Sequence, residues 1–83
     1  MNYYNDKTSE RLIVYFNFDD ITAELIIPSK VLIGIESPNK VSMEYSNLAR
    51  EEINFGPKWK RVKAINHLVS SINDYWMYLN QKK

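Results

Sequence analysis

Residues 58–79 read KWKRVKAINHLVSSINDYWMYL, and their apolar positions recur at the spacing of an α-helix. The recurring positions, three or four residues apart, are Val62, Ile65, Val69, Ile72, Trp76 and Leu79. This spacing places them along one stripe of a helix. Gly56 and Pro57 come just before, and proline suits the first helical position because its missing amide would have no intrahelical partner there. The pattern predicts one long C-terminal amphipathic helix.

Upstream of this helix, four short segments have the features of β-strands. Residues 11–18 (RLIVYFNF) and 21–27 (ITAELII) are rich in β-branched and aromatic residues and flank a turn signal, which predicts a hairpin. Residues 30–36 (KVLIGIE) predict a third strand, and the alternating residues 41–45 (VSMEY) predict a fourth. A single helical turn is expected over 47–53. We therefore predict an α+β fold, in which a four-stranded, mostly antiparallel meander carries the long C-terminal helix on one face.

Length and composition predict one ordinary globular domain. The chain has 83 residues, 45% hydrophobic and 25% charged, and we expect a flexible tail at 1–9 followed by a single domain at 10–83. It contains no cysteine, which excludes disulfides, and small secreted domains usually contain them. The N-terminus lacks a signal-peptide pattern, and no apolar run reaches the length of a membrane span. We expect a cytoplasmic protein that does not enter a membrane.

One helix covers only one face of a sheet, so the predicted core leaves the other face open. The residues predicted to face the helix are Leu12, Val14, Phe16, Phe18, Ala23, Leu25, Val31, Ile33 and Met43. Alternation sends Ile13, Tyr15, Ile26 and Leu32 to the opposite face. A contiguous apolar patch of this kind is typical of a docking surface for another protein or for a second copy of the chain. The alternative is that the N-terminal segment, with Tyr3 and Tyr4, folds back over it.

The predicted helix also leaves residues outside its core stripe. The candidates for partner contact on this surface are Trp59, Lys60, Lys63, His67 and Tyr78. The first turns are strongly basic, with positive charge on Lys58, Lys60, Arg61 and Lys63. Because a helix N-terminus is already positive through its dipole, this cluster predicts either an anion site or a solvated face compensated by acids such as Glu51 and Glu52. Residues 57–83 hold six basic residues and one acidic residue, whereas residues 1–56 hold five basic and nine acidic residues.

The sequence offers little for catalysis or for a cofactor. His67 is the only histidine, and Asp74 lies about 10 Å from it along the predicted helix, too far to orient the imidazole for a nearby serine. One histidine without cysteine does not make a typical metal site. The only glycines are Gly34 and Gly56, so the chain lacks a glycine-rich phosphate loop. We expect neither an enzyme nor a bound cofactor or metal.

These observations support two functional hypotheses from different classes. The first is a small protein-binding module, an inhibitor or adaptor of the kind that a bacteriophage or mobile element uses to block a host enzyme. The second is a nucleic-acid-binding protein, in which Lys58, Lys60, Arg61 and Lys63 contact phosphates and Trp59 stacks on a base. The acidic character of residues 1–56 opposes the second hypothesis. A homodimer formed through the predicted open face is compatible with both.

Overall fold

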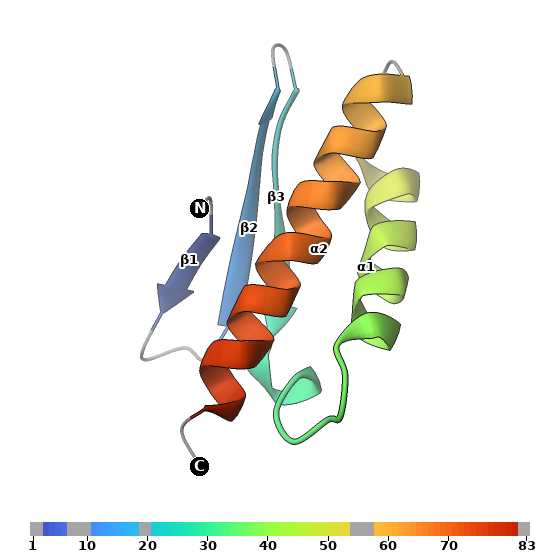
Figure 1. Ribbon diagram of the computed structural model, residues 1–83. Coiled ribbons are helices and arrows are strands. Elements are labelled where there is room, and N and C mark those ends of the chain that lie inside the picture. Colours follow the sequence, from blue (N-terminus) through green and yellow to red (C-terminus); the bar gives the residue numbers. More distant parts are fainter. Residues whose placement is uncertain (1–2, 7–10, 19–20, 54–57, 82–83) are drawn as a thin grey trace.

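The structure, a computed structural model, describes residues 3–6, 11–18, 21–53 and 58–81, which form an antiparallel sheet with two helices on one of its faces (Figure 1). The elements are β1 (Tyr3–Asp6), β2 (Arg11–Phe18), β3 (Ile21–Pro28), the 3-10 helix η1 (Ser29–Val31), α1 (Asn39–Glu52) and α2 (Lys58–Asn80). The strands lie in the order β1-β2-β3. The predicted α+β class is therefore confirmed, whereas a four-stranded meander with a single long helix is wrong.

The predicted hairpin is formed by β2 and β3. Their antiparallel register runs from Arg11 opposite Pro28 to Phe18 opposite Ile21. Because side chains alternate along a strand, Leu12, Val14 and Phe16 all point to the helix side, where they are buried in the core. The predicted inward face of β2 is thus confirmed for these three residues, and the side chain of Phe18 lies outside the described residues.

Strand β1 lies within the segment predicted as a tail. Tyr3–Asp6 pair antiparallel with β2, from Tyr3 opposite Val14 to Asp6 opposite Arg11. This pairing makes β2 the central strand of the sheet, with β3 at the opposite edge from β1. The central position fixes the backbone of β2 from both sides.

The predicted third strand is wrong, because the chain leaves the sheet after Pro28 and turns. Ser29–Val31 form η1, and the amides of Leu32 and Ile33 both donate to the carbonyl oxygen of Ser29, at 2.9 and 3.1 Å. Without a strand, side chains no longer alternate between the faces of the sheet. Leu32, predicted for the open face, is fully buried in the core, and Ile33, predicted for the core, is 56% exposed. Gly34 then adopts a positive φ of 78°, which an L side chain rarely tolerates.

The predicted fourth strand is also wrong, because its residues belong to α1. Val41, Tyr45 and Ala49 recur every four residues and face the core, whereas Met43, predicted to be inside, is 62% exposed. Five alternating residues are too short a window to separate the period of a strand from that of a helix. The helical turn expected over 47–53 is the second half of α1, which ends at Glu52.

The predicted C-terminal helix is confirmed as α2, with its buried stripe rotated from the prediction. Among the described side chains of α2, the fully or almost fully buried ones are Ala64, Leu68, Ser71, Ile72 and Tyr75. Ile65 and Trp76 are partly buried against the core, and Val62 is 52% exposed. The rotation arises because α2 packs both on β2 and beside α1, a second helix that was not expected (Figure 1).

The C-terminal end of α2 is tied to the loop that follows η1. Asn80 donates from Nδ2 to the carbonyl oxygen of Leu32 at 3.1 Å and accepts at Oδ1 from the amide of Gly34 at 3.0 Å. Trp76 Nε1 donates to the carbonyl oxygen of Ile35 at 3.1 Å. These bonds hold the turn that places Leu32 under the helix.

Candidate functional site

The face of the sheet that points away from both helices carries exposed apolar side chains. Tyr15 on β2 is 43% exposed and Ile26 on β3 is 46% exposed. Ile26 lies directly opposite Ile13, and Tyr15 lies two residues along β2 from Ile13 and opposite Glu24. Side chains directly opposite in an antiparallel pair are in contact distance, so Ile13 and Ile26 form one cluster with Tyr15 beside it. We call Ile13, Tyr15 and Ile26 the open-face cluster.

Polar side chains border the open-face cluster toward the turn of the hairpin. Ile13 itself is buried, whereas the exposed residues Glu24, Asn17 and Thr22 stand on the same face of the hairpin. An apolar centre inside a polar rim is the usual anatomy of a protein interface. Alternation in β2 and β3 predicted all three residues of the cluster on this face, and Leu32 is absent from it because it lies in the core.

Two residues of the predicted helix surface lie against the rest of the fold. His67 is partly buried on α2; its Nε2 lies 3.0 Å from the carbonyl oxygen of Tyr15, and its ring meets that of Phe16 edge-on at 5.8 Å between centroids. A carbonyl oxygen only accepts, so Nε2 carries the proton in this bond. Tyr78 is partly buried and stacks on Tyr75 with centroids 6.2 Å apart. His67 therefore fixes the backbone of β2 at the residue whose side chain is exposed on the other face.

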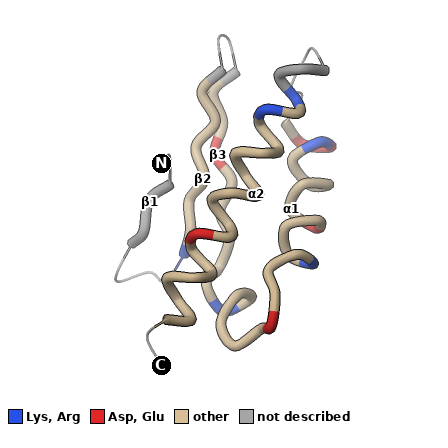
Figure 2. The backbone as a smooth tube through the Cα atoms, in the orientation of Figure 1, with Lys and Arg blue, Asp and Glu red and all other residues tan. Residues whose placement is uncertain are grey.

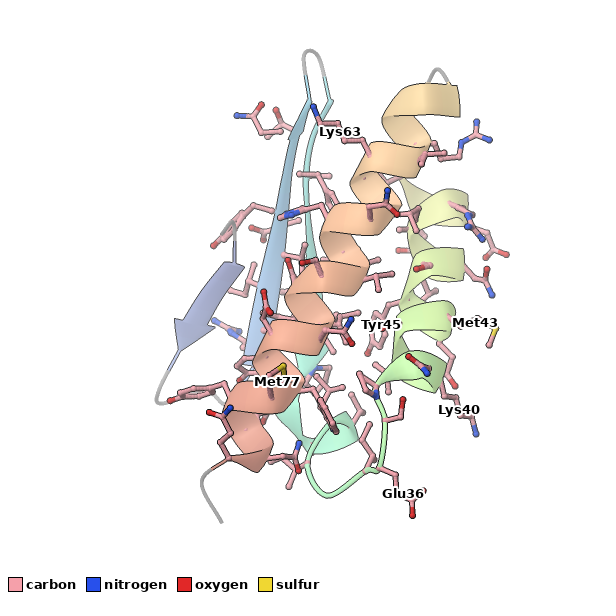
Figure 3. All side chains as sticks on the ribbon, in the orientation of Figure 1. Glu36, Lys40, Met43, Tyr45, Lys63 and Met77 are labelled. Carbon is pink, nitrogen blue, oxygen red and sulfur yellow. The ribbon has the colours of Figure 1, made fainter. Side chains whose placement is uncertain are left out.

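The described basic residues near the start of α2 lie on different sides of that helix. Lys63 is exposed and reaches toward β2 and β3 (Figure 3). Arg61 is exposed and lines a groove beside α1 together with Arg50. The side chains of Lys58, Trp59 and Lys60, predicted as an anion or partner site, lie outside the described residues. Arg61 and Lys63 alone do not form a single patch.

The groove beside Arg61 was not predicted from the sequence. It has a volume of about 380 Å³ and is lined by Arg50, Arg61, Val62, Ile65 and Asn66. Arg50 lies in the last turn of α1, where its Nη1 donates to Asn47 Oδ1 at 3.2 Å. The groove forms because α1 and α2 run side by side with the end of one next to the start of the other (Figure 1). The sequence prediction has only a single helical turn over 47–53, and a strand at 41–45, where α1 lies, so it contains no second long helix beside α2.

Ser71, one of the two serines near His67, has a structural partner. Ser71 Oγ donates to the backbone carbonyl of His67 at 2.9 Å, and the His67 ring nitrogen is engaged with Tyr15 as described above. Within the described residues, no group of three or more His, Cys, Asp or Glu side chains is arranged to hold a metal ion. In that same part of the chain, neither α1 nor α2 combines the length and the apolar character that a membrane span requires.

No protein family, curated protein or solved structure matches this chain. The functional argument therefore depends on the two surfaces described above, the open-face cluster and the groove between the helices.

Proposed function

We propose that this chain is a small, non-enzymatic protein-binding module and that the open-face cluster contacts its partner. One observation carries the proposal: Tyr15 and Ile26 expose nearly half of their surface next to each other, on the face that neither helix covers. The cluster also stands on a rigid base, because β2 is the central strand and Ile13 anchors the cluster in the sheet. Rigid presentation favours binding, since little conformational entropy is lost on contact.

The size of the cluster sets the strength of binding that it can support. Full burial of a large apolar side chain contributes about 1.5–3 kcal/mol, so covering the exposed half of Ile26 contributes about 1 kcal/mol. Tyr15 adds a similar amount and a hydroxyl that can reach a partner, and tyrosine is common at interface hot spots. These contributions alone do not give tight binding, so the polar rim around Glu24 has to take part.

The class of partner follows from the chemistry of the cluster. An apolar face bordered by polar side chains is suited to binding another protein. Such binding is expected of a cytoplasmic inhibitor or adaptor, for example a bacteriophage or mobile-element protein that blocks a host enzyme. A second copy of the chain is another occupant of the same chemistry. In that case the protein forms a homodimer through the cluster, which light scattering detects as a doubled mass.

Quantitative affinity capture with matched variants tests the proposal. Ile26→Lys places a charge in the open-face cluster beside Glu24, and Met77→Lys places the same charge on the outer surface of α2, where Met77 is 49% exposed. Partner recovery is expected to fall at least fivefold with Ile26→Lys and to stay at the wild-type level with Met77→Lys. Circular dichroism of both variants verifies that they fold. Equal recovery with Ile26→Lys and wild type contradicts the proposal.

Nucleic-acid binding is the second candidate function, supported by the exposure of Arg61 and Lys63 near the start of α2. Two observations oppose this function. The two residues lie on different sides of α2, and residues 1–56 hold more acidic than basic residues. A binder that neutralises phosphates releases counterions, so its affinity falls steeply with salt. Retention of mixed oligonucleotides at low salt, lost in Lys63→Gln, would favour this function over the open-face cluster.

A further inference from the structure

The groove between the helices combines positive charge with an exposed apolar floor. Arg50 comes from the last turn of α1 and Arg61 from the first turns of α2, so two different helices bring guanidinium groups to one groove. Val62, 52% exposed, and Ile65 supply the apolar part, and Asn66 adds an amide. Figure 2 shows the basic positions at these adjoining ends of α1 and α2.

Among the described residues that line the groove, none is acidic. Glu51 and Glu52 follow Arg50 directly, but successive helical residues are rotated by about 100°, which turns both away from the side of α1 that carries Arg50. A carboxylate in the groove is attracted by both guanidinium groups. Arginine also presents five donors, of which the contact from Arg50 to Asn47 uses one, and it binds carboxylates through paired hydrogen bonds.

We infer that this groove binds an acidic peptide segment of a partner protein, one that presents a carboxylate next to an aliphatic side chain. The carboxylate lies between Arg50 and Arg61, and the aliphatic side chain covers Val62 and Ile65. A volume of about 380 Å³ is within the range of small ligand sites and accommodates a short stretch of peptide. A phosphate backbone would satisfy the charges and leave the apolar floor uncovered, so the peptide fits better. The inference goes beyond the proposed function, because it concerns a different surface of the molecule.

Titration of the isotope-labelled full chain with three short peptides tests this inference. The probes are acetyl-Glu-Leu-Glu-Leu-amide, its charge-reversed form with lysine in place of glutamate, and its polar form with serine in place of leucine. We expect the first probe to shift the amide NMR signals of Arg50, Arg61, Val62, Ile65 and Asn66. The polar form is expected to bind more weakly, and the charge-reversed form is expected not to bind.

Matched variants separate specific binding from general attraction. Arg50→Gln and Arg61→Gln should each weaken the first probe about tenfold, because a hydrogen bond to a charged group is at stake. Lys63→Gln makes the same change of charge on another side of α2, and it should weaken the probe no more than about twofold. Thermal unfolding of each variant verifies that the fold is intact.

Four results would overturn the inference. They are failure of the first probe to shift these signals, equal binding of all three probes, an equal loss with Lys63→Gln, and shifts of the same signals by a short oligothymidylate in place of the peptide. The last of these would assign the groove to phosphate. Ile26→Lys should leave peptide binding unchanged, so the groove and the open-face cluster can fail independently.

Discussion

Truncating Leu32 should destabilise the protein far more than truncating its neighbour Ile33. Leu32 is fully buried in the core, and its carbonyl oxygen accepts a hydrogen bond from Asn80 of α2, whereas Ile33 is 56% exposed. A third strand over 30–36 would place them the other way round, with Ile33 inside and Leu32 outside. The pair Leu32→Ala and Ile33→Ala therefore distinguishes the turn after Pro28 from a strand.

The expected magnitudes follow from burial. Leucine-to-alanine substitutions at fully buried sites cost about 2–5 kcal/mol in the free energy of unfolding. For Ile33 less than half of the side chain is covered, so the loss should be below about 1 kcal/mol. In a domain of this size each kcal/mol lowers the Tm by about 4–8 °C. A loss of about 3 kcal/mol at Leu32 thus corresponds to roughly 12–24 °C.

Urea unfolding followed by circular dichroism measures both losses. Tryptophan fluorescence is a second probe, because Trp76 is hydrogen-bonded to Ile35 in the same loop. Coincident transitions by the two probes support two-state unfolding, on which the comparison depends. An Ile33→Ala loss equal to or larger than the Leu32→Ala loss would refute the reasoning and restore a strand at this position.

Three further predictions each test a single feature of the fold. Ser42 is buried and its Oγ lacks a hydrogen-bond partner among the described residues, so Ser42→Ala should raise the free energy of unfolding by about 1 kcal/mol. Urea unfolding should show a smaller gain in stability for Ser71→Ala, whose Oγ has a partner, and a loss of stability with Ser42→Ala would contradict this account. Burial, and secondarily the charge of Glu44, raises the pKa of Tyr45 above 10.0, so the folded state holds the phenolic proton more tightly. The stability that this proton contributes is present below pH 10 and is lost as the pH rises through the folded pKa. The free energy of unfolding, measured from about pH 9 to 11, should therefore fall less steeply in Tyr45→Phe than in the wild type, and identical pH profiles would refute this prediction. Gly34 has a φ of 78° and open space around a built Cβ, so Gly34→Ala should cost about 1 kcal/mol from backbone strain alone, and Gly34→Asn less, as thermal unfolding can show.

The sequence predicts those elements whose pattern is long enough to fix a period. The 23 residues of α2 have clear helical spacing, the eight of β2 are rich in β-branched and aromatic residues, and both elements are confirmed. The five residues 41–45 fit a strand and a helix equally, and only the packing of Val41 and Ala49 against the core decides for α1. Local pattern cannot supply that information.

The same limit decides which parts of the candidate surfaces can be predicted. Tyr15 and Ile26 are on the open face because strand alternation is a local property. The sequence places Leu32 on that face only because residues 30–36 are predicted to form a third strand, whereas the chain turns after Pro28. The groove of Arg50 and Arg61 needs two long helices side by side, and the sequence predicts only a strand at 41–45 and a single helical turn at 47–53 in place of α1.

Site-specific photo-crosslinking tests the open-face cluster most directly. A photoreactive amino acid at position 26 stands in the cluster, and the same group at position 77 stands on the outer surface of α2 with similar exposure. In cells that make the chain, position 26 is predicted to crosslink to one defined protein, a partner or a second copy, while position 77 gives none. Crosslinks of equal yield at both positions, or a defined product at position 77 alone, would contradict the claim that the open face of the sheet is the binding surface.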